Sequence, residues 1–128
     1  MQEIFAGVSW IGVIIGAIVA LLVAWLWYSP KVFGAKWAEG SGVDLSDARS
    51  MPVSPLIIQF IGLFLMSWFV GVTAVNNALL TVILATAAFC VMYYANGMFG
   101  RRSAYARGVD VGYWIVSLAI MIVAQGIF

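Results

Sequence analysis

The feature that most constrains this chain is a set of four long apolar runs that contain no lysine or arginine, at residues 7–28, 55–75, 78–96 and 109–128. About 18 or more apolar residues are enough to cross the hydrocarbon core of a bilayer. Backbone N–H and C=O groups inside lipid must bond within their own segment, so each run is expected to be a helix. The runs do not alternate as the strands of a membrane barrel do. The sequence therefore predicts one membrane domain, residues 1–128, with an all-α bundle of four transmembrane helices.

The composition supports this fold class and narrows the function. Charged residues make up 9% of the chain, against about 25% in a typical soluble domain. A net charge of +1 gives no basic field for nucleic acid, so no nucleic-acid partner is expected. The chain has no histidine, which is the commonest general base and metal ligand. No catalytic, cofactor-binding or metal-binding residues are predicted.

The basic residues predict an orientation. All six fall in two loops, 29–54 and 97–108, which lie on the same side of a four-helix topology: Lys31, Lys36, Arg49, Arg101, Arg102 and Arg107. Short loops rich in lysine and arginine stay in the cytoplasm. The prediction is a multi-pass protein of the bacterial inner membrane, with both termini in the periplasm.

A sequence motif recurs at the cytoplasmic ends of the first and third predicted helices. WYSPKVFGAKWAEG (27–40) aligns with YYANGMFGRRSAYA (93–106). Each copy has paired aromatics, a helix-ending Pro30 or Asn96, a Phe-Gly pair and then bases. Aromatics and bases of this kind anchor helices at the headgroup level, so we expect both helices to bend at Pro30 or Asn96. The interfacial residues are Trp27, Tyr28, Pro30, Phe33, Gly34, Trp37, Tyr94, Phe99 and Gly100. Two interpretations remain open: two repeated helical hairpins, or convergence on a composition that suits the interface.

The first copy of this motif also resembles a known family. Its W-Y-S-P, its F-G and a tryptophan four residues after the phenylalanine are similar to the bacterial membrane proteins of domain-of-unknown-function family 1761. The residues that carry the resemblance are Trp27, Tyr28, Pro30, Phe33, Gly34 and Trp37. The resemblance implies a small multi-pass membrane protein. It implies no known activity, and therefore no catalytic residues.

Small residues predict where helices approach each other closely. Gly12, Gly16, Ala20 and Ala24 recur every four residues in the first helix, and Gly108 and Gly112 repeat the spacing at the start of the fourth. Small residues at this spacing allow two membrane helices to come into backbone contact. The contact is either within the monomer or along a dimer seam, and packing within the monomer is the favoured interpretation.

Asp110 is the candidate functional carboxylate, because an acid in a membrane segment often marks a transport or proton-relay site. The alternative is structural. Acids favour helix N-termini, and Arg107 precedes Asp110 by three residues, the spacing of an ion pair on one helix.

The function predicted from these features is a structural or accessory subunit, not an enzyme. It would contact the lipid bilayer and pack against other membrane subunits or against itself. The alternative is one subunit of a small homo-oligomeric transporter or channel.

Overall fold

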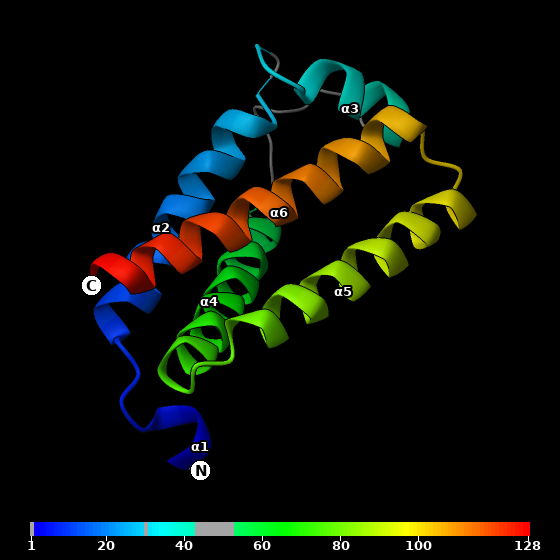
Figure 1. Cartoon of the computed structure of the whole chain (residues 1–128). Coiled ribbons are helices and arrows are strands. Elements are labelled where there is room, and N and C mark those ends of the chain that lie inside the picture. Colours follow the sequence, from blue (N-terminus) through cyan, green and yellow to red (C-terminus); the bar gives the residue numbers. More distant parts are fainter. Residues whose placement is uncertain (1, 30, 43–52) are drawn as a thin grey trace.

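The computed structural model describes residues 2–29, 31–42 and 53–128, and within these ranges the chain is helical with no strand (Figure 1). The helices are α1 (Gln2–Phe5), α2 (Trp10–Trp27), α3 (Gly34–Ser41), α4 (Val53–Val75), α5 (Leu79–Phe99) and α6 (Ala104–Ile127). Four of these, α2, α4, α5 and α6, are long and apolar enough to cross a membrane. The predicted all-α membrane fold class is confirmed.

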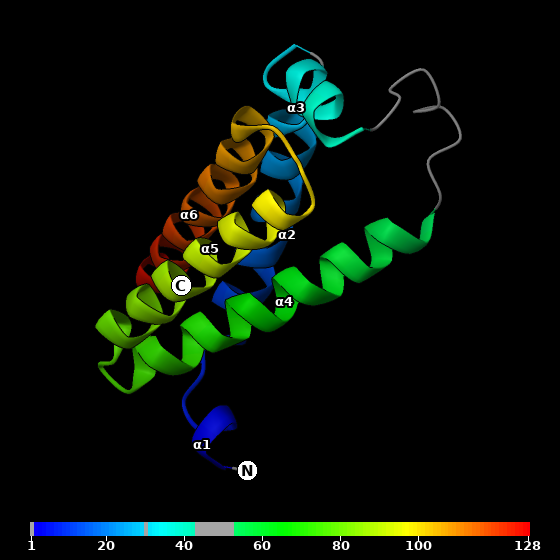
Figure 2. The same cartoon turned by 90° about the vertical axis from the view of Figure 1, so that its right-hand side faces the viewer.

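The other three long helices, α2, α4 and α5, all pack against α6. Helix α2 packs against both α4 and α6, whereas α5 packs mainly against α6 and lies on the other side of α6 from α2 (Figure 1). The short helix α3 packs against α6 at the end of the bundle where the α5–α6 turn lies (Figure 2). Helix α1 and the C-terminus lie toward the opposite end, with the α4–α5 turn. The segments that carry the described bases therefore share one end of the molecule.

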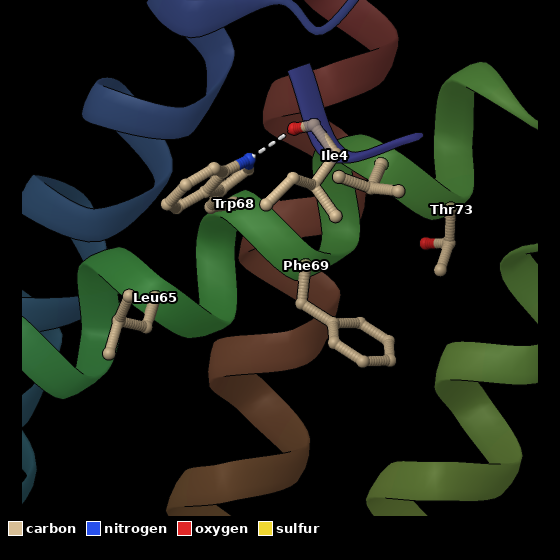
Figure 3. Close-up of a pocket in the computed structure, with 6 residues that line it drawn as sticks. Ile4, Leu65, Trp68, Phe69 and Thr73 are labelled. Carbon is tan, nitrogen blue, oxygen red and sulfur yellow. Dashed lines mark hydrogen bonds between the residues drawn. The ribbon is translucent and has the colours of Figure 1, made fainter. Parts of the chain in front are cut away.

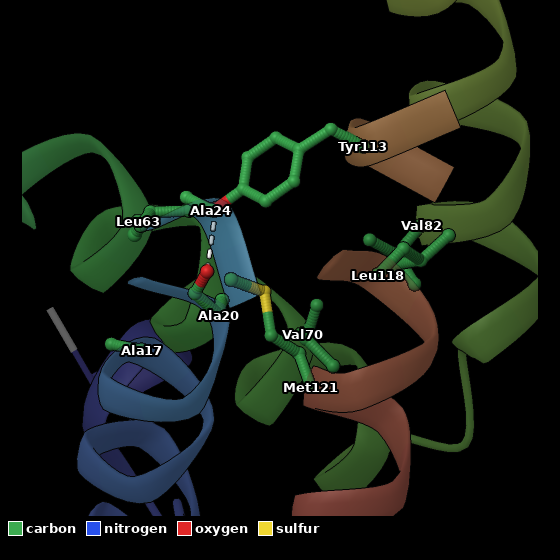
Figure 4. Close-up of a cluster of buried hydrophobic side chains, with 9 residues drawn as sticks. All are labelled: Ala17, Ala20, Ala24, Leu63, Val70, Val82, Tyr113, Leu118 and Met121. Carbon is green, nitrogen blue, oxygen red and sulfur yellow. Dashed lines mark hydrogen bonds between the residues drawn. The ribbon is translucent and has the colours of Figure 1, made fainter. Parts of the chain in front are cut away.

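The core consists of small residues from α2 facing larger side chains from the other three long helices (Figure 4). Ala17 and Ala20 are fully buried, and because they are small, α4 and α6 can approach the α2 backbone. The Tyr113 hydroxyl of α6 donates to the carbonyl oxygen of Ala20 at 2.7 Å. The core comprises Ala17, Ala20, Ala24, Leu63, Val70, Val82, Tyr113, Leu118 and Met121.

The small-residue ridge of α2 also faces polar side chains. Gly12, Gly16, Ala20 and Ala24 are all buried. A Cβ added at Gly16 would lie 2.8 Å from the Ser67 hydroxyl oxygen, which donates to the Val13 carbonyl. The same addition at Gly12 would lie 2.9 Å from the side-chain nitrogen of Gln125. The glycines thus leave room for side chains that donate to backbone carbonyls, Ser67 to that of Val13 and Gln125 to that of Ser9.

The second small-residue pair does not pack in this way. Gly112 lies against the indole ring of Trp27, but Gly108 is exposed and a Cβ there would meet no atom within 4 Å. The expectation that Gly108 packs within the monomer is wrong. Gly108 lies one turn before Gly112 on the same side of α6, where the Trp27 ring that contacts Gly112 does not come within 4 Å of an added Cβ.

The equivalence of the two motif copies is also wrong. Helix α2 ends at Trp27 and the chain turns into α3, whereas α5 continues without a bend through Asn96 to Phe99. Helix α6 then begins at Ala104, so most of the expected loop 97–108 is helical. The physical reason is that Asn96 keeps its backbone N–H, unlike a proline, and is tolerated inside a helix. Pro30 itself lies outside the described residues.

Two other helix ends differ in detail from the sequence expectation. The first spanning helix begins at Trp10 rather than near Gly7, because Ser9 caps it by accepting from the Gly12 amide. Helix α4 begins at Val53, two residues before the expected start.

Candidate functional site

Asp110 is the centre of the most polar group of side chains in the described structure. The residue is 3% exposed. Arg102 Nη2 lies 2.6 Å from Oδ2 in an ion pair. Tyr28 donates its hydroxyl to Oδ1 at 2.5 Å, and the Trp37 indole N–H donates to the same oxygen at 2.9 Å. The Tyr93 hydroxyl lies 3.5 Å from Oδ2. These five residues, Tyr28, Trp37, Tyr93, Arg102 and Asp110, are called the Asp110 cluster below.

The turn after α2 places the first two donors. Tyr28 is the C-cap residue of α2, and the Gly34 amide donates to the Ser29 carbonyl at 2.8 Å to close the turn. A side chain at Gly34 would overlap the Tyr28 carbonyl, so glycine is required for this close approach. Helix α3 then starts at Gly34 and directs Trp37 to the same carboxylate as Tyr28.

Helix α3 is held on the α5–α6 turn by a second set of contacts. The Ser103 amide donates to the Gly40 carbonyl at 3.0 Å, and a side chain at Gly40 would overlap the Ser103 hydroxyl. Arg102 reaches α3 through Ser41, to which Nη2 donates at 2.8 Å, and it donates from Nη1 to the Tyr93 hydroxyl at 3.2 Å. One arginine therefore connects α3, α5 and α6.

Aromatic rings enclose the cluster on the side of the bundle core. Tyr28 packs edge-on against Trp37, with ring centroids 4.9 Å apart, and against Tyr113 at 5.7 Å. Trp27 donates its indole N–H to the Val109 carbonyl at 3.0 Å and packs on Phe33 at 4.7 Å. The rings exclude water, which strengthens the charged hydrogen bonds of Asp110.

The electrostatics keep the Tyr28 hydroxyl neutral and Arg102 charged. Tyr28 lies one residue beyond the span of α2, and its burial, together with its hydrogen bond to Asp110, raises its pKa. Burial lowers the pKa of Arg102, but its bonds to Tyr93 and Asp110 outweigh that effect, so the pKa is raised overall. At neutral pH Tyr28 is therefore a hydroxyl donor and Arg102 a cation.

The cluster is suited to holding helices together rather than to proton transfer. A carboxylate offers about four lone-pair positions on its two oxygens. In this chain two donors meet Oδ1, and Arg102 and Tyr93 approach Oδ2. Little acceptor capacity is left for a substrate or a transferred proton.

The structure brings together some of the sequence-predicted residues and separates others. Trp27, Tyr28, Phe33, Gly34 and Trp37 gather near Asp110. By contrast, Phe99 is 88% exposed at the end of α5, and Gly100 is only the C-cap of that helix.

The predicted partner of Asp110 is wrong. Arg102 makes the ion pair, whereas Arg107 places its guanidinium 4.5 Å from the centre of the Tyr94 ring. Because α6 starts at Ala104, Arg107 and Asp110 lie on one helix, but Arg107 points toward α5 and Asp110 toward α2. Tyr93 is not among the site residues predicted from the sequence, although Tyr93 and Tyr94 form the paired aromatics of the second motif copy.

A shallow apolar hollow lies near the other end of the bundle, away from the Asp110 cluster (Figure 3). Helix α1 lies against α4 there, and the Trp68 indole N–H donates to the Ile4 carbonyl at 2.6 Å. The one hydroxyl in its lining, that of Thr73, already donates to the Val70 carbonyl. The hollow therefore offers apolar contact but no reactive group; it is lined by Ile4, Leu65, Trp68, Phe69, Val72 and Thr73.

Comparison with known proteins gives one match. The model of a family described as "Protein of unknown function (DUF1761)" matches residues 11–126. No curated protein and no solved structure matches the chain.

Proposed function

The chain belongs to the DUF1761 family of proteins of unknown function, and from this premise we propose that it is a non-catalytic structural or accessory subunit that packs against other membrane helices. The proposal places it in the bacterial inner membrane with the α3 end in the cytoplasm and both termini in the periplasm. It is not an enzyme in this proposal.

The observation that carries the proposal is the saturation of Asp110. A carboxylate that serves as a substrate-binding or proton-relay group needs a free acceptor position. Asp110 instead receives an ion pair from Arg102 and hydrogen bonds from Tyr28 and Trp37. Its role within the chain is to connect the end of α2 and helix α3 to α6. The charge supports a rigid helix arrangement rather than a reaction.

The surface of α5 supports contact with other apolar partners. Its inward face carries Val82, Thr86 and Cys90, and its other faces carry large apolar side chains. Leu80 is 81% exposed and Leu84, one turn later, is 71% exposed. Such a face suits lipid chains, and it equally suits a helix of another subunit.

The distribution of bases supports the proposed orientation. The described bases lie on α3, on the segment before it, at the α5–α6 connection and at the start of α6, which share one end of the bundle (Figures 1 and 2). The α4–α5 turn at the other end is Asn76–Ala78 and carries none. By the positive-inside rule, the end of the bundle that carries the bases is the one expected to face the cytoplasm.

Co-purification tests the proposal. The protein is extracted in a mild detergent, and its complexes are separated by size and identified by mass spectrometry. A stoichiometric membrane-protein partner, or a stable homo-oligomer without a polar lumen, supports an accessory role. A monodisperse monomer across mild detergents contradicts it, and a homo-oligomer that conducts solute in liposomes favours the transporter alternative.

Paired variants identify the face that the partner uses. Leu84→Ala shortens an exposed side chain on α5, and Leu22→Ala does the same on α2, where Leu22 is also exposed. We expect Leu84→Ala to reduce the partner recovered and Leu22→Ala to leave it unchanged. Equal recovery from both variants would exclude the α5 face as the contact.

A further inference from the structure

Arg107 is held in place on the surface formed by α5 and α6. Its guanidinium carbon lies 4.5 Å from the centre of the Tyr94 ring, and Nε donates to the Ser103 carbonyl at 3.3 Å. A Cβ at Gly97 would lie 2.7 Å from Arg107 Cγ and 3.0 Å from Cδ. The arginine stem therefore crosses α5 at the one position where no side chain obstructs it. Its orientation is set before any ligand arrives.

This cation has no carboxylate partner within the described ranges. The single ion pair there joins Arg102 to Asp110, so the acid of α6 is already neutralised. Arg107 lies over a tyrosine ring, and so does Lys36, which is 5.2 Å from the centre of the Tyr105 ring. Cations stacked on aromatic rings keep their charge and most of their donors for another partner.

Arg101 brings a second cation to the same turn. It is exposed and has a left-handed φ of 59°, directly after the C-cap residue of α5. Glycine or asparagine adopts this conformation at lower cost than arginine does. The backbone therefore gives no reason for an arginine rather than a glycine at this position.

The length of α6 places these groups at the depth of lipid headgroups. Its 24 residues extend about 36 Å at 1.5 Å per residue, against a hydrocarbon core of about 30 Å. The excess of about 6 Å is about one helical turn, which is enough for the first turn of α6, with Arg107, to lie beyond the hydrocarbon. Arginines at this depth face the phosphate layer, while tyrosines beside them suit the interface.

We propose that Arg107, Arg101 and the Tyr94 ring form a binding site for the headgroup phosphate of an anionic phospholipid. Arg107 supplies a directed guanidinium that can donate two hydrogen bonds to one phosphate. Arg101 adds a second positive charge, and Tyr94 positions Arg107 and contacts the lipid near the glycerol. The site gives the protein a preference for anionic over zwitterionic lipid, beyond its role as a helical subunit.

Gly97→Ala tests the site without removing any charge, because the added methyl group displaces the stem of Arg107. Gly108→Ala is the matched control, since a methyl group there meets nothing within 4 Å. Native mass spectrometry in a neutral detergent measures how much phosphatidylglycerol and phosphatidylcholine stay bound. We expect the wild-type protein to retain phosphatidylglycerol preferentially. Gly97→Ala should lower that preference by about fivefold, the worth of one arginine near a lipid surface, and Gly108→Ala should leave it unchanged.

Two further variants keep the test decisive if Gly97→Ala does not fold. Arg107→Gln should cause a loss of similar size. Arg101→Gly should also weaken phosphatidylglycerol binding, yet leave the thermal midpoint unchanged or raised because glycine suits the left-handed backbone. Equal retention of both lipids by the wild-type protein would overturn the proposal, as would unchanged preference in Arg107→Gln. Displacement of phosphatidylglycerol by millimolar inorganic phosphate would assign the site to free phosphate instead of lipid.

Discussion

Breaking the ion pair between Arg102 and Asp110 should destabilise the bundle more than removing both charges together. Arg102→Gln removes the cation beside Asp110, a residue that is 3% exposed, and leaves it with only tyrosine and tryptophan donors. Removing one partner of a buried pair costs about 3–5 kcal/mol. The side chain of Arg102 is 23% exposed, so we expect a value near the lower limit, about 3 kcal/mol.

The companion variants separate the charge from the hydrogen bonds. Asp110→Asn keeps an oxygen for Tyr28 and Trp37 and leaves a cation that can turn toward water, so it should cost about 1–2 kcal/mol. Arg102→Gln combined with Asp110→Asn has no unpaired buried charge. The double variant should therefore be more stable than Arg102→Gln alone, with a coupling energy of roughly 2–3 kcal/mol between the two positions.

The assay is reversible unfolding in mixed micelles, followed by the fluorescence of the tryptophans that line the site. The free energies of unfolding of the wild-type protein, both single variants and the double variant form a complete cycle. If the two single changes add to within about 0.5 kcal/mol, the pair is not coupled and Asp110 does not clamp the helices. A double variant less stable than either single variant would refute the reasoning in the same way.

Three other predictions follow from the packing, the pKa of Tyr28 and the distribution of charge. Gly16→Ala should destabilise the bundle by about 1–3 kcal/mol through overpacking against α4, whereas Gly62→Ala, where an added methyl group meets nothing, should be neutral or stabilising by up to about 1 kcal/mol in thermal unfolding. Because the folded pKa of Tyr28 is raised above its ordinary value of about 10, its contribution is complete below pH 10 and is lost as the pH rises further. Tyr28→Phe should therefore flatten the alkaline fall in unfolding free energy, and an unchanged slope would count against the buried hydroxyl. On a cysteine-free background, Phe128→Cys should react with a membrane-impermeant thiol reagent in intact cells and Glu39→Cys should not; the opposite labelling would reverse the orientation.

The sequence by itself determined the fold class and the placement of the spanning segments. Uncharged apolar runs leave the backbone no alternative to helices in lipid, and this constraint depends on neither packing nor partners. The small-residue spacing of α2 likewise indicated its buried face, because residues four apart share one side of a helix. Gly12 and Gly16 are buried where that spacing places them.

Only the tertiary structure decided which residues meet at Asp110. Local spacing favoured Arg107, three positions away on the same helix, but Tyr28 and Trp37 come from 82 and 73 positions earlier in the chain. Whether such distant groups meet depends on the rotation and crossing of α2, α3 and α6, which hydropathy does not encode. The same holds for the repeated motif. Its two copies have similar composition, and although Asn96 is tolerated inside a helix as proline is not, how the chain continues after each copy also depends on tertiary contacts such as the docking of α3 on α6.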